Sequence, residues 1–365
     1  MRFRSILKIL VTSAILLSFV VGMTDRRNQV LTLGLTLILV IILIAEYYLF
    51  MENVMPEKSD FNLDLGELRK LVDTEGFPVR LNSLIVAEGE IPDWIVVAGG
   101  AQKGFPISFT SFQVVYEDKT IIIECPFNRR LYEKFCGYRL LGIKGKRFYE
   151  ENYEVMQRAM LDANYIVATH EHWDHVGGIA QSPNVGRLME KTVLTSEQVH
   201  GHTIAKAGFP EGVFDDYAPL EYNGYHVLAP GVVLIEAPGH SVGSQMIFVR
   251  LRGGVEFLFV GDVAWNMVNV EGLVNHSRMG MLLRYENGSQ LGHQIRWLHE
   301  NIYDNLEEDV HLLTSHDPRQ IEEYTKSGLI GATFELSTTV HNSTPNNQAG
   351  IRQAIETVSD FSGES

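Results

Sequence analysis

Cysteine is nearly absent from this 365-residue sequence, which contains only Cys125 and Cys136. A single disulfide between them is chemically allowed, but nothing in the sequence requires it, and buried free thiols are the expected state of both. The same scarcity argues against a closed structural zinc site built from cysteines. Any metal site in this chain must therefore use histidine and carboxylate ligands.

Basic residues are also scarce, since 30 Lys and Arg stand against 45 Asp and Glu, a formal net charge of -15. Residues 1–52 carry five basic and three acidic side chains, which leaves -17 for the rest of the chain. So acidic a protein repels phosphate backbones, and this argues against nucleic acid as a partner. With 45% hydrophobic residues, the chain is long enough for one large domain and additional segments.

Metal-binding side chains are concentrated in residues 169–178, THEHWDHVGG, directly after the apolar run 165–168, which predicts a buried strand. Four of these residues bind transition metals well: His170, His172, Asp174 and His175. If the chain stays extended, the first three point to one side, and a turn at the two glycines brings the fourth toward a second centre. Imidazole with carboxylate suits an open zinc site that also holds water. The stretch therefore predicts a catalytic site for two ions, and the alternative of surface histidines on a polar loop is disfavoured by the spacing.

This arrangement resembles the metallo-β-lactamase-fold hydrolases, over roughly residues 91–335. Three further segments match the family's remaining ligand positions, each just after an apolar strand: 237–241 (APGHS), 259–262 (FVGD) and 314–317 (TSHD). The resemblance implies that a first metal is held by His170, His172 and His240. It implies that a second metal is held by Asp174, His175 and His316, with Asp262 bridging the two.

Strands interspersed with helices predict two sheets packed face to face with helices outside, an αββα sandwich with the ligand loops along one edge. The main elements we expect are strands at 94–98, 111–116 and 120–124 and helices at 150–163 and 289–306. Glu124-Cys125-Pro126 stands where the resembled family usually has an Asp-Thr-Gly-like turn that braces the metal site. This departure leaves the residues that support the ligands unidentified.

Two apolar runs, 6–23 and 30–51, precede the predicted domain. As a helix, the second run would span about 33 Å, enough for a bilayer, and Tyr47 and Tyr48 fit an interfacial aromatic belt. The first run is either a signal peptide or the other half of a transmembrane hairpin. We favour the hairpin, because a signal peptide followed so closely by a second spanning helix is uncommon.

The predicted organisation is a transmembrane hairpin over 1–52, a linker over 53–90 with one short helix near 65–72, the hydrolase domain over 91–335 and a polar C-terminal tail over 336–365. The protein is thus expected to be an integral membrane protein, with the lipid bilayer as a partner. Basic residues on both outer flanks of the hairpin favour a cytoplasmic catalytic domain. The acidic flank after the second helix, taken alone, favours the opposite side.

The expected activity is hydrolysis that depends on two zinc ions per chain, with iron or manganese as alternative metals. Two such ions share one water and lower its pKa to about 7, which makes hydroxide available as a nucleophile. Asp174 is the expected catalytic residue, which orients this water or moves its proton. No ligand of the resembled family is missing, which disfavours the alternative of a catalytically silent binding protein.

The expected substrate is a small carboxylic ester or lactone with an apolar, possibly acyl, portion. Residues 237–245 and 315–317 resemble the corresponding segments of N-acyl homoserine lactonases, and Asp262 in place of Cys departs from the antibiotic-degrading members. Those lactonases commonly place a Tyr three residues after the bridging Asp, where this chain has Trp265, a candidate wall of the substrate pocket. A glyoxalase-II-like thioesterase and a phosphodiesterase are the alternatives.

Overall fold

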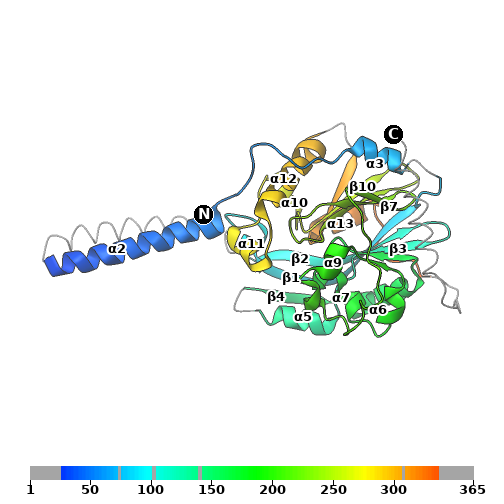
Figure 1. The fold of residues 1–365 in the computed structure, drawn as a ribbon, viewed down its shortest axis with the longest axis horizontal. Coiled ribbons are helices and arrows are strands. Elements are labelled where there is room, and N and C mark those ends of the chain that lie inside the picture. Colours follow the sequence, from blue (N-terminus) through cyan, green and yellow to red (C-terminus); the bar gives the residue numbers. More distant parts are fainter. Residues whose placement is uncertain (1–25, 73–74, 101–103, 139–141, 306–308, 337–365) are drawn as a thin grey trace.

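Two β-sheets pack face to face with helices on both outer faces, which confirms the predicted αββα sandwich (Figure 1). The computed structural model describes residues 26–72, 75–100, 104–138, 142–305 and 309–336. Within them, the first sheet has six strands in the order β4-β1-β2-β3-β5-β6, and the second has five in the order β11-β10-β9-β8-β7.

The first sheet and its helices come mainly from the N-terminal half of the body. Its strands are β1 (Arg80–Pro92), β2 (Gly104–Val115), β3 (Thr120–Ile123), β4 (Lys144–Phe148), β5 (Tyr165–Val167) and β6 (Thr192–Val193). β1, β2 and β3 pair antiparallel, whereas β3, β5 and β6 pair parallel. The helices of this half are α5 (Arg129–Cys136), α6 (Glu150–Asp162), α7 (Trp173–Ala180), α8 (Val185–Met189) and α9 (Ser196–His200).

The second sheet follows in the chain and is antiparallel except for its last pair, β10 with β11. Its strands are β7 (Tyr225–Ala229), β8 (Val232–Glu236), β9 (Gln245–Arg250), β10 (Glu256–Gly261) and β11 (Val310–Thr314). The helices of this half are α10 (Met267–Glu271), α11 (Arg278–Arg284), α12 (Gly288–Leu298) and α13 (Pro318–Lys326).

Apolar side chains fill three layers, one between the sheets and one under each layer of helices. β3 illustrates why its sequence is a continuous apolar run: Ile121 and Ile123 point between the sheets, and Ile122 points toward the outer helices. The predicted hairpin of β2 and β3 is confirmed, as is the predicted helix at 150–163, now α6. The helix expected at 289–306 is α12 continued by a π-helical turn, His299–Tyr303.

The strand expected at 94–98 is wrong, because residues 93–96 form a short helix, α4 (Asp93–Val96). Pro92 ends β1 at the N-cap of this helix, and Ile95 and Val96 are apolar because they are buried, not because they alternate along a strand. A run of four or five apolar residues cannot by itself distinguish a buried strand from a buried helical turn.

Residues 53–90 are not a linker, since they contain packed structure. The short helix expected near 65–72 is present as α3 (Leu65–Leu71), and Leu68 is fully buried against the second sheet. Arg69 of the same helix forms an ion pair of 2.6 Å with Glu256. β1 then begins at residue 80. The charged composition that favoured a linker belongs to the outer face of an amphipathic segment.

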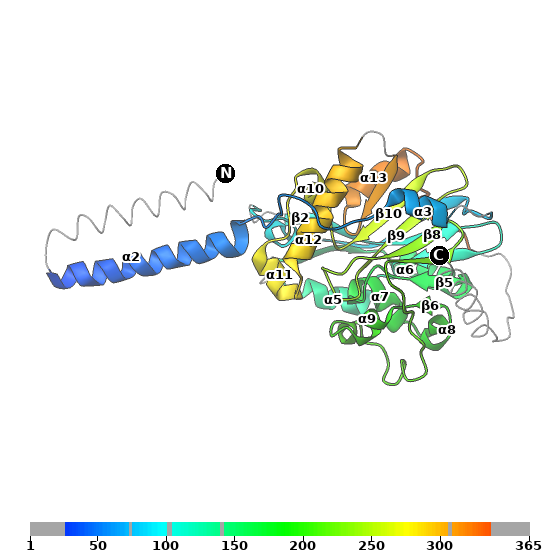
Figure 2. The same cartoon turned by 45° about the horizontal axis from the view of Figure 1, so that its top comes forward.

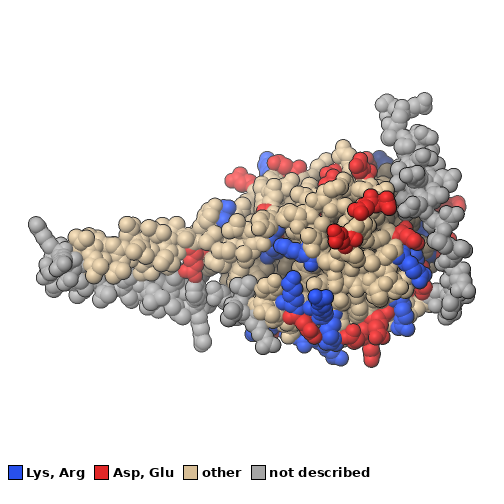
Figure 3. Space-filling view, turned by 60° about the horizontal axis from the view of Figure 1, so that its bottom comes forward, with Lys and Arg blue, Asp and Glu red and all other residues tan. Residues whose placement is uncertain are grey.

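The apolar run 30–51 forms a helix, α2 (Arg26–Glu46), continued by a π-helical turn, Tyr47–Met51, and the helix projects from the body (Figures 1 and 2). It is the only helix of the described ranges that is long and apolar enough to cross a membrane, and none of its apolar window is buried. It is therefore not a core helix. Charged side chains gather on the body and are sparse along the helix (Figure 3). The run 6–23, and with it the predicted hairpin, lies outside the described residues, as does residue 337 onward.

Candidate metal centre

The loops that follow four strands meet at one edge of the sandwich and bring all seven predicted ligands together. His170 and His172 follow β5, and Asp174 and His175 stand in the first turn of α7. The remaining three follow β8, β10 and β11: His240, Asp262 and His316. Although the outermost two ligands are 146 positions apart in the sequence, the fold gathers the seven side chains into two groups.

The motif does not stay extended through Asp174, contrary to the expectation from its spacing. His172 has extended backbone angles at the N-cap of α7, and the helix begins at Trp173. Gly177 and Gly178 therefore lie inside a helix and make no turn. A Cβ on Gly178 would lie 2.6 Å from the carbonyl oxygen of Pro126, so this glycine lets α7 pack closely on residues 125–127.

The first group consists of three imidazole nitrogens and one carboxylate oxygen. His172 Nδ1 lies 3.0 Å from His170 Nε2 and 2.9 Å from His240 Nε2. Asp262 Oδ2 lies 3.2 Å from His240 Nε2 and 3.8 Å from His170 Nε2. Four potential ligand atoms thus converge on one point.

The second group uses the other oxygen of the same carboxylate. Asp262 Oδ1 lies 3.3 Å from His175 Nε2 and 3.3 Å from His316 Nε2. Asp174 Oδ2 lies 3.9 Å from His175 Nε2 and 3.7 Å from His316 Nε2. Asp262 therefore faces both groups, one oxygen to each.

Hydrogen bonds to the far ring nitrogens leave lone pairs pointing into the two groups. His175 Nδ1 donates to Glu124 at 2.7 Å, His240 Nδ1 donates to Glu286 at 2.7 Å, and His316 Nδ1 donates to the Ser108 carbonyl at 2.9 Å. With Nδ1 as the donor, each Nε2 can present a lone pair to a cation. Three such buried atoms have no hydrogen-bond partner: His175 Nε2, His316 Nε2 and Asp262 Oδ1. Buried polar atoms without partners are costly, and a cation in the second group would satisfy these three. The histidine and carboxylate set of the two groups fits ions of the zinc, iron or manganese type.

The electrostatics differ between the two groups. Burial, reinforced by the neighbouring histidines, holds the pKa of His170 and His172 well below the usual value, so both rings are neutral at neutral pH. Burial raises the pKa of Asp262, but the surrounding histidines lower it by more, so the net pKa lies well below the usual range. Burial lowers the pKa of His175, but Glu124 and Asp262 raise it by more, so its net pKa lies well above the usual value; the pKa of His316 is raised in the same way by Asp262. The first group therefore offers neutral imidazoles, whereas an ion that enters the second group displaces a proton from each ring.

Comparisons with known proteins agree with this geometry. The family profile described as "Metallo-beta-lactamase superfamily" matches residues 153–308. Solved structures of an N-acyl homoserine lactone hydrolase with the product N-hexanoyl-L-homoserine bound at its catalytic metal centre, and of a probable metal-dependent hydrolase from Staphylococcus aureus, superpose with TM-scores of 0.52 and 0.50 at 18% and 14% identity. These alignments cover 68% and 67% of this chain and 96% and 91% of the two structures. The chain has the metallo-β-lactamase fold.

Sequence relatives match a smaller part of this metallo-β-lactamase-fold chain. An N-acyl homoserine lactonase of Bacillus thuringiensis is 27% identical over 110 residues, and one of Rhizobium radiobacter is 28% identical over 120 residues. The matches cover 30% and 29% of this chain and 42% and 43% of those proteins, so less than half of each relative is spanned. The profile match ends before His316, whose position comes from the structure and the local motif alone.

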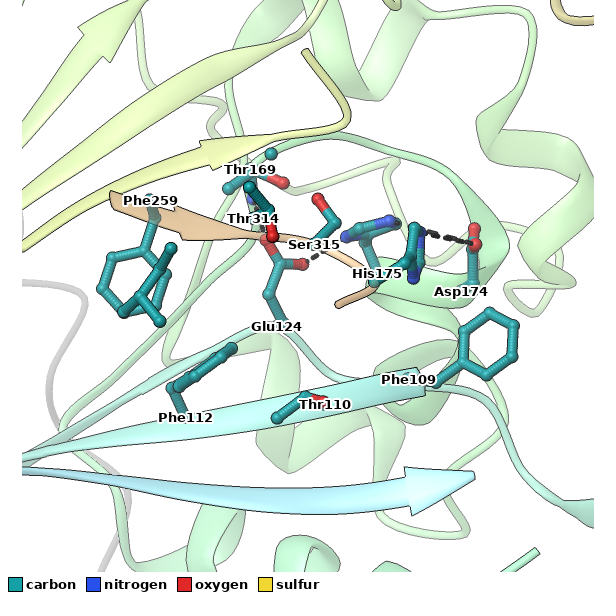
Figure 4. Close-up of a pocket in the computed structure, with 13 residues that line it drawn as sticks. Phe109, Thr110, Phe112, Glu124, Thr169, Asp174, His175, Phe259, Thr314 and Ser315 are labelled. Carbon is teal, nitrogen blue, oxygen red and sulfur yellow. Dashed lines mark hydrogen bonds and ion pairs between the residues drawn. The ribbon is translucent and has the colours of Figure 1, made fainter. Parts of the chain in front are cut away.

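Glu124 supports the second group of this metallo-β-lactamase fold. Its Oε2 bonds His175, and its Oε1 accepts the backbone N–H of Thr169 at 3.0 Å (Figure 4). The backbone of Glu124 has φ 63°, a left-handed conformation that turns its side chain toward the ligands. The sequence did carry a signal for it, since Glu124 occupies the place of the family's bracing turn.

Glu286 supports the first group, and no local sequence pattern indicated it. One oxygen accepts from His240, and the other lies 3.0 Å from His276 Nδ1. Arg284 Nε donates to the same carboxylate at 2.6 Å. The cluster of His240, His276 and Glu286 has the composition of a third metal site. We read it as support for the first group, because Arg284 already neutralises the carboxylate and would repel a further cation.

Trp265 lies beside the second group and is largely buried. The centre of the Trp265 ring is 4.7 Å from that of His316. The guanidinium of Arg284 lies over the same Trp265 ring, 4.9 Å from its centre. With 9% of its surface exposed, Trp265 packs against a predicted ligand. Its contact with substrate stays a prediction.

Proposed function

We propose that this protein is a metal-dependent hydrolase with a binuclear centre, anchored to a membrane by α2. The observation that carries the proposal is the position of Asp262, whose two oxygens face two separate groups of histidines. Both groups contain a nitrogen with a lone pair directed inward by a hydrogen bond on the far side of the ring. The residues that would hold the first ion are His170, His172 and His240, and those that would hold the second are Asp174, His175 and His316.

Ions bound there supply a hydroxide at neutral pH and polarise the oxygen of the bond to be cleaved. The chain's own residues orient the attacking water and accept or donate its proton. Of the two aspartates in the centre, Asp174 is the more exposed, with 12% of its side chain accessible against 1% for Asp262. Asp174 can therefore reach water, and we assign to it the orientation of the attacking water and the transfer of its proton. Asp262, enclosed by histidines, only binds.

The substrate class we propose is a carboxylic ester or lactone with an apolar portion. The named activity of the Bacillus and Rhizobium relatives supports it, as does the aromatic wall beside the second group. The strongly acidic chain disfavours a phosphodiester, which is itself an anion. Thioester hydrolysis and phosphodiester hydrolysis remain the ranked alternatives.

Steady-state rates of the full chain in detergent decide between these substrates. Matched lactone, glutathione thioester and bis(p-nitrophenyl) phosphate substrates should be turned over in that order. A preference for the phosphodiester of more than about tenfold, some 1.4 kcal/mol in the barrier, would overturn the order. Asp174→Asn, which keeps the shape of the side chain, should lose most of the activity, because the amide cannot accept the proton, and should also hold the second ion more weakly, because an amide is a poorer ligand than a carboxylate.

The anchor is supported by length, composition and exposure. The helix at 30–51 has 22 residues, none of its apolar window buried in the body, and its tyrosines stand near the end that joins the body. We propose that the body lies on the cytoplasmic side, on the charge distribution described above. A reporter enzyme fused after Ser365 should be active only on the cytoplasmic side, and activity on the opposite side alone would reverse the orientation.

A further inference from the structure

One helix of the body lies directly against the end of the proposed anchor. The π-helical turn Tyr47–Met51 packs on α11, where the Arg278 guanidinium lies 4.3 Å from the centre of the Tyr48 ring. Arg278 Nε also donates to the Glu52 carboxylate at 2.9 Å. α11 is thus fixed at the point where the projecting helix meets the body, as both ribbon views show (Figures 1 and 2).

α11 and its C-cap carry exposed apolar side chains, of which only Tyr285 has a ring contact with the residues that the structure describes in the body, 5.1 Å from the ring centre of His202. Apart from the 30–51 helix, eight large apolar or aromatic side chains are exposed in the described part of the chain, and three of them fall within residues 282–285. Leu282 is 64% exposed, Leu283 is 54% exposed, and Tyr285, at the C-cap of α11, is 70% exposed. No other stretch of four residues on the described body has such a concentration.

The length of the anchor determines the depth at which α11 lies. A helix of 22 residues spans about 33 Å, which matches a hydrocarbon core of about 30 Å. Tyr47 and Tyr48, near its body end, then reach the headgroup level, where tyrosine is enriched. Because Arg278 contacts Tyr48, α11 lies close to the same level.

We propose that α11 inserts Leu282, Leu283 and Tyr285 into the bilayer surface beside the anchor, so that a lipid surface is the partner of this face. This inference rests on the proposed membrane anchoring. Apolar faces of helices that lie in the membrane plane enter the boundary between headgroups and acyl chains by about 5–10 Å, which is the reach of a leucine or tyrosine side chain here.

The inserted helix leads directly into the metal centre. Glu286 follows Tyr285 and bonds the predicted ligand His240, and the next residue, Asn287, donates its N–H to the Gly239 carbonyl at 2.7 Å. Val242, two residues after His240, is exposed. The chain that follows α11 is thus bonded to the His240 loop, which lies next to the proposed lipid-facing helix.

Depth-dependent quenching of a fluorophore tests the insertion. The full chain, with the partly exposed Cys136 replaced by Ser and the buried Cys125 retained, receives Leu283→Cys, is labelled with an environment-sensitive dye and is reconstituted into phosphatidylcholine vesicles. Vesicles whose lipids carry a spin label at the headgroup end of the acyl chain should quench most of the fluorescence. The same background without an added cysteine gives the labelling blank.

Val79→Cys is the matched control, since Val79 is also exposed but lies just before the first residue of β1, at the end of the strand away from α11. The thirteen residues of β1 separate it from the α4 and α11 side by about 40 Å. Its label should keep its fluorescence in the same vesicles. Equal quenching at both positions, or none at 283, overturns the proposal. A label at 283 that is shifted to the blue but unquenched by lipid indicates a protein on α11 and overturns it as well.

Failure of the proposed function gives different results. A chain that does not co-sediment with vesicles lacks the anchor, and one that sediments but binds no zinc lacks the centre. Leu282→Ser with Leu283→Ser should lower the hydrolysis rate for a long-chain ester in vesicles by about tenfold, while the rate for a short, water-soluble ester is unchanged. Equal loss on both esters would mean that α11 supports only the fold.

Discussion

The proposed binuclear centre depends on Asp262. Replacing it with Ala removes the one oxygen pair shared by the two histidine groups, so two cations would face each other without a negative charge between them. We expect the zinc content to fall from close to two per chain to less than one, measured by elemental analysis after gel filtration.

His200→Ala is the matched control for this change, because His200 is an exposed histidine outside both groups. It should keep the full zinc content, and circular dichroism should show both variants folded. A folded Asp262→Ala protein that still holds two zinc ions would contradict the assignment of the bridge.

The two supporting glutamates should affect the two ions separately. Glu286→Gln weakens the hydrogen bond to His240 and so the first ion, and Glu124→Gln weakens the bond to His175 and so the second. Losing such a partner typically lowers metal affinity by about 10–100-fold. We expect a loss of this size for one ion in each variant, measured by competition with a chelator. If either variant loosened both ions equally, the separation into two groups would be wrong.

Glu286 also gives the metal-free protein a defined acid sensitivity. Burial raises the pKa of the Glu286 carboxyl, but Arg284, His276 and His240 lower it by more, so the net pKa lies well below the usual value. A depressed folded pKa stabilises the protein above the unfolded pKa of about 4.3, and this contribution is lost as pH falls below that value. The free energy of unfolding in urea should therefore drop less between about pH 6 and about pH 3 in Glu286→Gln than in the unchanged protein. An equal drop in both would mean that the carboxyl is not coupled to folding.

That seven side chains gather in two groups could be predicted from sequence, and the residues that orient these proposed ligands largely could not. The proposed ligands stand in short motifs after apolar strands, and such a pattern can be recognised in the local sequence. Glu286 reaches His240 across 46 positions, and such a contact exists only after the fold has formed. Glu124 was singled out as a departure from a family pattern, but its bond to His175 could not be read from that.

Among the elements, α7 depends on glycine for its position against residues 125–127. Gly178→Ala would place a Cβ 2.6 Å from the Pro126 carbonyl and 2.9 Å from that of Cys125. We expect a loss of about 1–3 kcal/mol in the free energy of unfolding and weaker binding of the second ion, since Asp174 and His175 move with the helix. Urea unfolding and zinc titration measure the two effects.

Gly186 in α8 serves as the control, because a Cβ there meets nothing within 4 Å. Gly186→Ala should leave zinc binding unchanged and should stabilise the protein by about 0.4–1 kcal/mol. Equal effects of the two substitutions would show that close packing of α7 is not the reason for Gly178.

Elements with one clear periodicity were predicted, and those with mixed signals were not. α6 has regular helical spacing, and β3 is bounded by a polar hairpin turn. β1 carries Glu88 and Glu90, and α4 is a single apolar turn after a proline. Their structure is decided by what they pack against, which the local sequence does not record.

On the scale of the whole molecule, the junction between anchor and body contributes to stability. Asn53 accepts the N–H of Asn275 and donates to the Leu273 carbonyl, both at 2.9 Å. Deleting residues 1–46 should release a folded body that binds zinc. Deleting 1–56 should remove these bonds and others from the same segment, such as those of the Val54 and Pro56 carbonyls to Asn275 and Arg296. The free energy of unfolding should fall by roughly 1 kcal/mol for each bond lost. Thermal unfolding of the two truncated proteins compares them, and identical stability would show the junction to be passive.

The parallel pairing of β10 with β11 sets an order of events during synthesis. The last ligand, His316, follows β11, and that strand joins the sheet only after the whole 262–309 connection has been made. At about 5–20 residues per second, the ribosome needs on the order of 15 to 50 s to go from the end of the apolar helix to His316. On the proposed anchoring, the nascent chain is tethered at the membrane during this interval with an incomplete second group, so a second ion would bind only there, after His316 has joined the group.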